Sequence, residues 1–222
     1  MRHIKEEQPL AYKIDIQCVP YISRLNMTGM CRDPIYLEKI GKEVLIDLEK
    51  IKSLLYKEAG QQFDINSPQQ VSEIVFNKLK IPPQQLTPKG KASTSDKAIG
   101  VLAPNYPFVK RLLDARSLEK FIGTYINPSI NEIYEETGDR LHGDYNLFHV
   151  PTSRLSCGAT KSRGGINLHS VPKKSDSKYK IRSAFIAPDG FSFVKFDFSN
   201  VEYRIIANVS GETNLIKTFN EG

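Results

Sequence analysis

The sequence has little of what secreted, membrane-spanning or metal-clustering proteins contain. It has three cysteines in 222 residues, Cys18, Cys31 and Cys157, whose odd number and wide spacing provide neither a disulfide framework nor a paired metal motif. No apolar run approaches the roughly 18 residues that a membrane span needs. The first residues, 1–7, form no apolar signal core. These absences predict free thiols, a reducing cytoplasmic compartment and no membrane partner.

Apolar residues make up 40% of the chain, which can support a hydrophobic core and excludes disorder as the main state. The length allows one large domain or two small ones. The sequence contains no internal repeat and no low-complexity tract.

The net charge of +6 is concentrated in loops. Residues 152–182 contain eight Lys or Arg residues and one Asp, a net +7, so the rest of the chain sums to −1. A second stretch, 78–97, has five lysines and one Asp. Both are rich in Gly, Ser, Thr, Asn and Pro, which is typical of loops. Such loops suit a phosphate backbone, but charge alone fits a merely solubilising loop equally well.

Helices are predicted throughout the first half. Asp33 and Gly60 can cap a long amphipathic helix over 33–59. A second helix begins at Ser67 with a capping-box pattern and ends at the prolines 82–83. The pattern further predicts a short helix from Thr94 or Ser95 to Pro104, and a long helix from Pro107 that ends before Pro128.

The second half has strand signals. Residues 141–150 are predicted to be extended, 152–180 to be loop, and 184–187, 188–190 and 191–198 to form a strand, a turn and a strand. Helices should follow over 201–209 and 212–219. The fold class is therefore α+β, with a boundary near 115–125. Two strands are marginal in water, so further strands must come from the N-terminal segment, from 141–150 or from another chain.

One carboxylate stands out at the end of the predicted strand 191–198. Asp197 lies between Phe196 and Phe198, where the chain turns into a helix. A carboxylate in apolar surroundings costs several kcal/mol unless it is paired or bound to a cation. Alternatively, Asp197 caps the helix or pairs with Arg204, since structural Asp residues outnumber catalytic ones.

The segment 197–204 reads Asp-Phe-Ser-Asn-Val-Glu-Tyr-Arg. It resembles motif A of the family A DNA polymerases, the group of bacterial DNA polymerase I and many phage replicative polymerases. Five more segments resemble the family in order and spacing: 63–70 and 90–95 its thumb, 152–156 its Thr-Gly-Arg-Leu-Ser motif, 166–172 its Pro-Asn-Leu-Gln-Asn-Ile-Pro motif, and 181–190 the stretch before motif A. The resemblance runs from about residue 9 to the C-terminus.

Some positions depart from the family pattern. Phe198 replaces Tyr, which removes a hydroxyl but keeps the backbone carbonyl, and Ser153 replaces Gly before Arg154. His169 and Ser170 replace Gln and Asn near the primer–template minor groove. From the resemblance we expect the family's O helix and its His-Asp-Glu strand, with the second metal-binding aspartate, to lie outside residues 1–222, as would a 3′–5′ exonuclease domain.

The resemblance implies an incomplete right-hand polymerase fold. Residues 1–30 are expected to be a first palm segment, and 31–120 a helical thumb. Residues 121–222 would be part of an antiparallel-sheet palm, and the fingers would be missing.

The resemblance also implies nucleotidyl transfer with two Mg²⁺ ions about 4 Å apart. Asp197 and the Phe198 carbonyl would bind metal. Ser199, Asn200 and Glu202 would contact the nucleotide. Glu202 is also expected to be a catalytic residue, which would exclude ribonucleotides at the sugar 2′ position.

DNA contacts are implied for the basic loops. Arg154, Asn167 and His169 would face the minor groove. Arg182 and the tip of the thumb, around residues 89–95, would hold phosphates. The tip residues are Lys89, Lys91, Ser93, Thr94 and Ser95. The set His142, His149, Cys157 and His169 matches no compact zinc module, so zinc is not expected.

The partners expected are primer–template DNA, dNTP and a second polypeptide that carries the fingers and the His-Asp-Glu motif. On this hypothesis the chain is the N-terminal half of a split polymerase, inactive alone, in a bacterial or phage-infected cell. The alternatives are a non-catalytic primer–template binding module and a truncated, inactive remnant.

Overall fold

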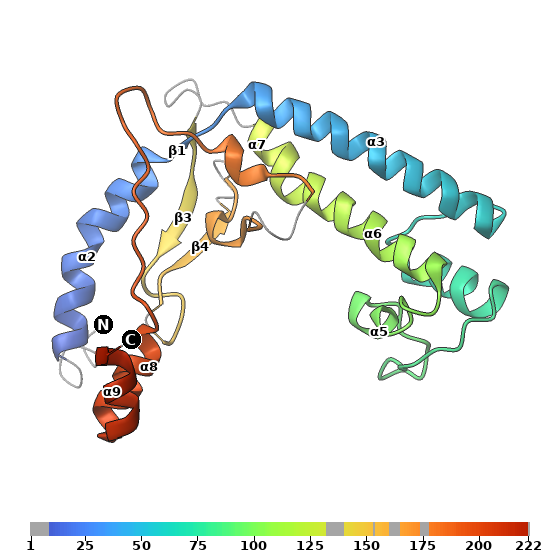
Figure 1. Cartoon of the computed structure of the whole chain (residues 1–222). Coiled ribbons are helices and arrows are strands. Elements are labelled where there is room, and N and C mark those ends of the chain that lie inside the picture. Colours follow the sequence, from blue (N-terminus) through green and yellow to red (C-terminus); the bar gives the residue numbers. More distant parts are fainter. Residues whose placement is uncertain (1–8, 132–139, 153, 160–164, 174–177, 222) are drawn as a thin grey trace. The chain divides into compact units, whose positions relative to one another are not determined.

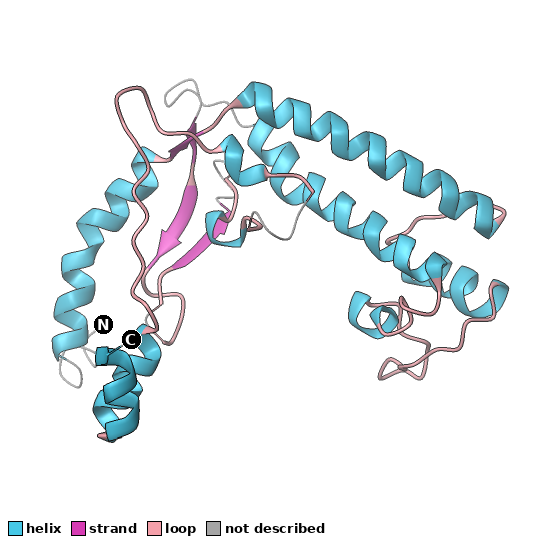
Figure 2. Ribbon diagram, viewed as in Figure 1, coloured by secondary structure: helices cyan, strands magenta, loops and turns pink. Residues whose placement is uncertain are grey.

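The computed structural model describes residues 9–131, 140–152, 154–159, 165–173 and 178–221. The chain divides into two compact units, Met1–Ile186 (unit 1) and Ala187–Gly222 (unit 2), which are considered separately. Figure 1 labels their elements, and Figure 2 distinguishes helix, strand and loop.

Unit 1 begins with helix α2, Pro9–Thr28, which contains Pro20 and was not predicted. Asn26 joins it to strand β3, Gly143–Asn146, because its amide Nδ2 donates to the Tyr145 carbonyl at 3.0 Å and its Oδ1 accepts from the Tyr145 N–H at 2.8 Å. The carbonyl of Asn26 also lies 2.9 Å from His142 Nδ1. These three contacts of Asn26 hold the C-terminal end of α2 against residues 142–145.

The long helix α3, Pro34–Ala59, confirms the prediction for 33–59. Asp33 caps it by accepting from the Tyr36 N–H at 2.9 Å, and Gly60 ends it in the left-handed conformation with φ 67°. The buried face includes Leu37, Val44 and Leu55, whereas the neighbouring Leu45 is 48% exposed.

The second predicted helix is present but changes type. It runs as α4, Pro68–Ser72, and then as the π-helix η1, Glu73–Lys78. Ser67 Oγ accepts from the Gln70 N–H at 3.4 Å, as a capping box requires. The Gln70 side chain, however, accepts from the Asp64 N–H at 2.8 Å, so it ties the preceding loop to the helix.

The short helix α5, Asp96–Gly100, is capped by Ser95, and turns follow it up to Pro104. Helix α6, Pro107–Phe121, begins at the predicted proline. The predicted end before Pro128 is wrong: the chain continues through the π-helix η2, Ile122–Ile126, into α7, Asn127–Asn131. The wider π turn accommodates a proline that has no N–H and would clash in an unbroken α-helix.

Helices α3 and α6 pack side by side and enclose most of the core of unit 1 (Figure 1). Gly41 of α3 faces η2 so closely that an added Cβ atom would lie 3.0 Å from Ile126 Cγ2. Val109, Leu112 and Ala115 of α6 are fully buried in this core.

Two small antiparallel sheets complete unit 1. Strand β1, Met30–Cys31, pairs with β2, Arg140–Leu141, and β3, Gly143–Asn146, pairs with β4, Ser156–Ala159. The prediction of extended structure over 141–150 holds only to Asn146, and strand β4 lies within the stretch predicted to be loop. Two 3-10 helices follow, η3 at Leu168–Ser170 and η4 at Ile181–Ala184.

The predicted strands around 184–198 are wrong. Residue 184 ends η4, Phe185 makes one isolated bridge to Arg32, and 191–198 form no strand in the described chain (Figure 2). The turn at 188–190 is present, since the Phe191 N–H donates to the Pro188 carbonyl at 3.0 Å. A strand needs a pairing partner, and no strand pairing involves 191–198 among the described residues.

Unit 2 contains the two helices that the sequence predicts. Helix α8, Val201–Ser210, ends at Gly211 with φ 69°, and α9, Thr213–Glu221, packs against it. The model is therefore helical with small antiparallel sheets.

Candidate nucleic-acid interface

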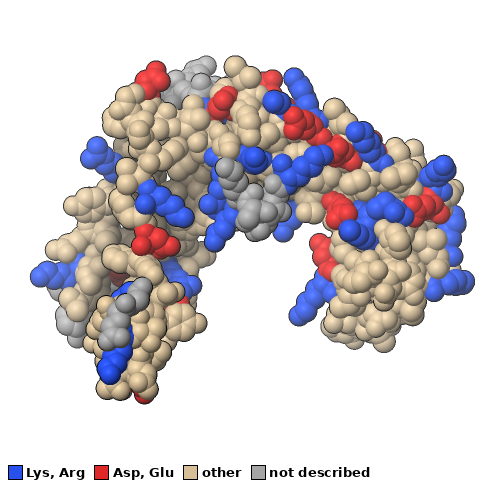
Figure 3. Space-filling view, viewed as in Figure 1, with Lys and Arg blue, Asp and Glu red and all other residues tan. Residues whose placement is uncertain are grey.

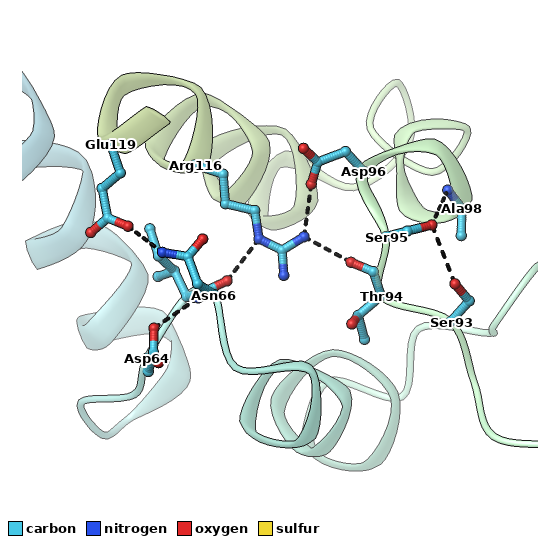
Figure 4. A network of polar contacts seen from close by, with 10 residues as sticks. Asp64, Asn66, Ser93, Thr94, Ser95, Asp96, Ala98, Arg116 and Glu119 are labelled. Carbon is cyan, nitrogen blue, oxygen red and sulfur yellow. Dashed lines mark hydrogen bonds and ion pairs between the residues drawn. The ribbon is translucent and has the colours of Figure 1, made fainter. Parts of the chain in front are cut away.

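The loop before α5 forms a hydroxyl-rich tip in unit 1. Ser95 Oγ accepts from the Ala98 N–H at 3.3 Å and lies 3.3 Å from Ser93 Oγ (Figure 4). Ser95 is exposed, Ser93 is half-buried and Thr94 is buried. The two serine hydroxyls therefore remain near solvent, whereas Thr94 mainly packs.

Arg116 of α6 organises this tip, and the sequence analysis did not identify it. Its Nε donates to the Ile65 carbonyl and its Nη1 to the Thr94 carbonyl, both at 2.7 Å (Figure 4). Nη1 also pairs with Asp96 at 2.8 Å. Because two of the three acceptors are backbone carbonyls, no residue motif could have indicated this role.

The two lysines predicted to hold phosphates flank a tight turn. The Thr87 N–H donates to the Lys91 carbonyl at 2.7 Å, and the Gly90 N–H to the Thr87 carbonyl at 2.9 Å. Gly90 has φ 74°, a conformation that favours glycine. Lys89 and Lys91 are exposed, and no ion pair involves either of them within the residues described. Their charges face solvent and suit an anionic partner.

A pocket of about 460 Å³ lies beside the tip, and the side chains of Asn66 and Lys120 help to line it. Asn66 donates to Glu119, which also pairs with Lys52 at 2.5 Å (Figure 4 shows Asn66 and Glu119). Along helix α3, acidic and basic side chains alternate on the face drawn in Figure 3. The helix pair thus has mixed charge, in contrast to the lysines at the turn.

The predicted minor-groove residues lie on a second loop. Asn167 caps η3, because its Oδ1 accepts from the His169 N–H at 3.0 Å. His169 is exposed, with its ring edge-on to Tyr145 at 5.4 Å. Tyr125 OH donates to the Ser170 carbonyl at 2.7 Å and holds this loop on η2.

Arg182, on η4, donates hydrogen bonds to the same loop. Its Nε and Nη2 donate to the Val171 carbonyl at 3.2 and 2.7 Å, and Nε also donates to the Pro172 carbonyl at 3.0 Å. These bonds hold the backbone that follows η3. Arg154 is exposed just before β4. Ser153 and several basic residues of the same stretch (Lys161, Arg163 and Lys174) lie outside the described residues.

The sheet behind this loop is tightly packed. An added Cβ at Gly143 would lie 2.7 Å from Cys157 Sγ, so no larger residue fits there. Burial, together with Cys157, raises the pKa of Tyr145 to about 12. Tyr145 is therefore neutral at ordinary pH and supports His169 by packing.

The motif A segment lies in unit 2. Residues 191–200 are all exposed, and Asn200 precedes α8 in the left-handed conformation with φ 52°. Asp197 forms no hydrogen bond or ion pair within the part of the chain that is described, and it does not occupy the N-cap position. Arg204 donates instead to the Ser199 carbonyl at 2.9 Å. The alternative roles considered for Asp197, a cap or a partner of Arg204, are therefore not observed.

The oxygen donors of this segment fit a hard cation. Mg²⁺ is bound in proteins by one or two carboxylates, and the remaining ligands are other oxygens. Asp197 supplies a carboxylate that is unpaired among the described residues, and Phe198 a backbone carbonyl. Among the same residues no group of three or more His, Cys, Asp or Glu side chains could hold a metal ion. This segment can therefore contribute ligands to a metal.

None of the helices within the described ranges is long and apolar enough to cross a membrane.

Comparison with known proteins places these loops in a family. The profile of DNA polymerase family A matches residues 35–222. The thermostable DNA polymerase I of Thermus thermophilus is 34% identical over 202 residues, which are 90% of this chain and 24% of that protein. DNA polymerase I of Geobacillus stearothermophilus is 32% identical over 218 residues, 97% of this chain and 23% of that protein.

A solved structure shows the same similarity. The POL domain of Pol1 from M. smegmatis, in complex with DNA primer-template and dNTP, superposes with a TM-score of 0.73 at 25% identity, covering 89% of this chain and 34% of that one. The chain spans about a quarter of the length of these curated relatives. From the profile match and the relatives together, the chain belongs to DNA polymerase family A.

Proposed function

We propose that these 222 residues are part of a DNA-directed DNA polymerase, in which they bind primer–template DNA and supply one metal-binding aspartate, Asp197. The observation that carries the proposal is the exposed carboxylate of Asp197, in the irregular segment just before α8, which is unpaired among the described residues, within a chain matched by the family from residue 35 to 222.

In this proposal Asp197 and the Phe198 carbonyl bind the metal. Two Mg²⁺ ions, when bound, stabilise charge on the attacking 3′-oxygen and on the leaving pyrophosphate. The free carboxylate of Asp197 suits this role, because Arg204 is held by other acceptors and does not neutralise it.

The turn that follows would contact the nucleotide. Ser199, Asn200 and Glu202 lie at the entry to α8, and Glu202 occupies its first turn. A glutamate next to the incoming sugar would crowd the 2′ position and so reject ribonucleotides.

DNA would be held by two sets of residues in unit 1. The exposed Lys89 and Lys91, with Ser93 and Ser95 beside them, would bind backbone phosphates without reading sequence, whereas the buried Thr94 would support the tip from within. Arg154, Asn167 and His169 would lie at the minor groove of the terminal base pairs, where every correct pair presents acceptors. Arg182, in addition to any phosphate contact, supports that loop from behind.

The subdomain assignment is part of the proposal. Residues 1–30 would belong to the palm, 31–120 to the thumb and 121–222 to the palm. The packed pair α3 and α6 with the tip beside it supports a helical thumb.

A two-metal site needs a second carboxylate, and the family supplies it on a His-Asp-Glu strand. We place that strand and the fingers outside residues 1–222; the split-polymerase hypothesis assigns them to a second polypeptide. The 222-residue chain alone is then expected to bind primer–template DNA without extending it.

Primer extension tests the proposal. The chain would be assayed with Mg²⁺ and dNTP alone, and again after mixing with a polypeptide that carries the O helix and the His-Asp-Glu motif. Extension only by the mixture supports the proposal. Extension by the chain alone would show that no second polypeptide is needed to complete the active site. Duplex binding without extension in the mixture would favour the alternative of a non-catalytic DNA-binding module.

A further inference from the structure

Asp47, in the middle of α3, holds a segment that is distant in sequence. Its Oδ2 accepts hydrogen bonds from the Lys178 ammonium group and from the Tyr179 hydroxyl. Lys50, one turn further along the helix, lies 3.9 Å from the other carboxylate oxygen. One carboxylate thus binds two consecutive residues of the basic loop.

The segment is also packed on the helices at this point. Tyr179 is only 6% exposed, and its ring lies 5.8 Å from that of Phe121 on α6. The Lys178 ammonium lies 5.3 Å from the centre of the Tyr179 ring. Burial and the Asp47 carboxylate raise the pKa of Tyr179, while the bonds from Lys178 and Tyr179 lower that of Asp47. Each group is therefore stabilised in the state that makes the contact.

From Tyr179 the contacts continue to the predicted minor-groove loop. The Ile181 N–H donates to the Tyr179 carbonyl at 2.9 Å and begins η4, whose Ile181 and Ala184 are buried. Arg182 of η4 holds the carbonyls of Val171 and Pro172, directly after η3. A continuous set of bonds therefore joins α3 to the turn that carries Asn167 and His169.

We propose that Asp47 is a positioning residue for DNA binding: by holding Lys178 and Tyr179 on α3, it fixes the loop that presents Asn167 and His169. This rests on the proposed function, because it takes duplex DNA as the ligand of that loop. Asp47 itself does not contact DNA in this arrangement.

Electrostatics alone predicts the opposite effect of removing Asp47. A carboxylate near a DNA-binding loop repels phosphates, so its neutralisation should strengthen duplex binding. Positioning predicts weaker binding in the same variant, because the loop is released. Whether the duplex affinity rises or falls when Asp47 is removed therefore distinguishes the electrostatic effect from the positioning effect.

The chain offers a matched control in Asp114. It lines the same pocket of about 420 Å³ as Asp47 and Tyr179, but no bond joins it to Lys178 or Tyr179 in the described structure. Asp47→Asn and Asp114→Asn change the charge equally at nearly the same place. Asp47→Glu keeps the carboxylate and serves as the rescue variant.

Two measurements on the full 222-residue chain test the proposal. The first is the rate of tryptic cleavage after Lys178 and Lys180, which requires the buried Tyr179 to detach. We expect cleavage to be about fivefold faster in Asp47→Asn, from the loss of charge-assisted hydrogen bonds, and nearly unchanged in Asp114→Asn and Asp47→Glu. The second is the affinity for a primer–template duplex at fixed salt, which should fall about threefold or more in Asp47→Asn only.

Unchanged cleavage in Asp47→Asn would overturn the proposal, and so would faster cleavage with equal or tighter duplex binding. Equal losses of binding in Asp47→Asn and Asp114→Asn would also overturn it. If the wild-type chain bound no duplex, the proposed function would fail together with the DNA part of this inference. The cleavage rates would then still show whether Asp47 holds the segment.

Discussion

Arg204 of α8 donates a hydrogen bond from Nη1 to the carbonyl of Phe219 in α9 at 2.8 Å, and its guanidinium lies 5.1 Å from the centre of the Phe219 ring. With the bond from Nε to the Ser199 carbonyl, this fixes the only Arg of the motif A segment within unit 2. Asp197 lies seven residues before it in sequence, and the bonds of Arg204 go to these carbonyls instead of to the Asp197 carboxylate.

Asp197→Ala should abolish DNA synthesis by the completed enzyme, with a loss of about a thousandfold or more, because a metal ligand is removed. Duplex binding should persist, since the tip and the η3 loop do not use this carboxylate. Primer extension and fluorescence anisotropy with the same duplex measure the two effects. Full synthesis by the variant would contradict the assignment of motif A.

Glu202→Ala should reduce the preference for dNTP over rNTP, because a shorter side chain opens space at the sugar 2′ position. Some activity should also be lost, because the variant lacks the packing contacts of the Glu202 side chain. The ratio of kcat/KM values for the two nucleotides measures the preference. An unchanged ratio would exclude Glu202 from sugar selection.

Replacing both Lys89 and Lys91 by Ala should weaken duplex binding for all sequences alike. Each lost phosphate contact should reduce the salt slope of log K by about one. Binding titrations at several salt concentrations test this, with Lys42→Ala on α3, whose lysine pairs with Glu38 instead, as the control. A sequence-selective loss would count against phosphate contacts.

Arg116→Ala should destabilise unit 1 by about 3 kcal/mol, because it leaves two carbonyls and Asp96 without their donor. Denaturant unfolding measures the loss. Lys110→Ala, an exposed position on the same helix, should change stability by less than about 0.5 kcal/mol. Equal stabilities of the two variants would show that the Arg116 bonds make no net contribution to the free energy of unfolding.

Tyr179→Phe should lower the free energy of unfolding by an amount that depends on pH. The pKa of Tyr179 is raised in the folded chain, so its contribution is fully present below the unfolded pKa of about 10 and declines as pH rises through the higher folded value. The pKa of Asp47 is lowered, so the contact is also lost as pH falls through that lowered value. Unfolding curves of both proteins from about pH 2 to 11 test this. A difference that stays constant above pH 10 would contradict it.

Local signals in the sequence were sufficient for most of the helices, although they did not predict α2. Asp33, Ser67 and Ser95 cap the helices as predicted, because a cap depends on residues three or four positions away. The predicted helix end before Pro128 was wrong. A proline ends a regular α-helix, and nothing in the sequence indicates that a π turn precedes this one.

Strands and polar contacts depended on distant residues. Strand β4 has the composition Ser-Cys-Gly-Ala, which carries no strand signal, and it forms because β3 lies opposite. Residues 191–198 carry a strong signal but have no partner within the described residues. Asn167 and Arg182 were identified by family resemblance, whereas their bonds to backbone groups became visible only in three dimensions.

The irregular segment 191–198 also affects how the chain can be handled. Phe193, Phe196 and Phe198 are 61–88% exposed beside backbone groups that no strand pairs. Short apolar stretches of this kind self-associate into intermolecular sheets unless charges interrupt them. Lys195 and Asp197 are the two charges in this stretch. Replacing Asp197 by alanine would remove one of these two charges, so we expect that variant to self-associate more readily and it should be studied at low protein concentration.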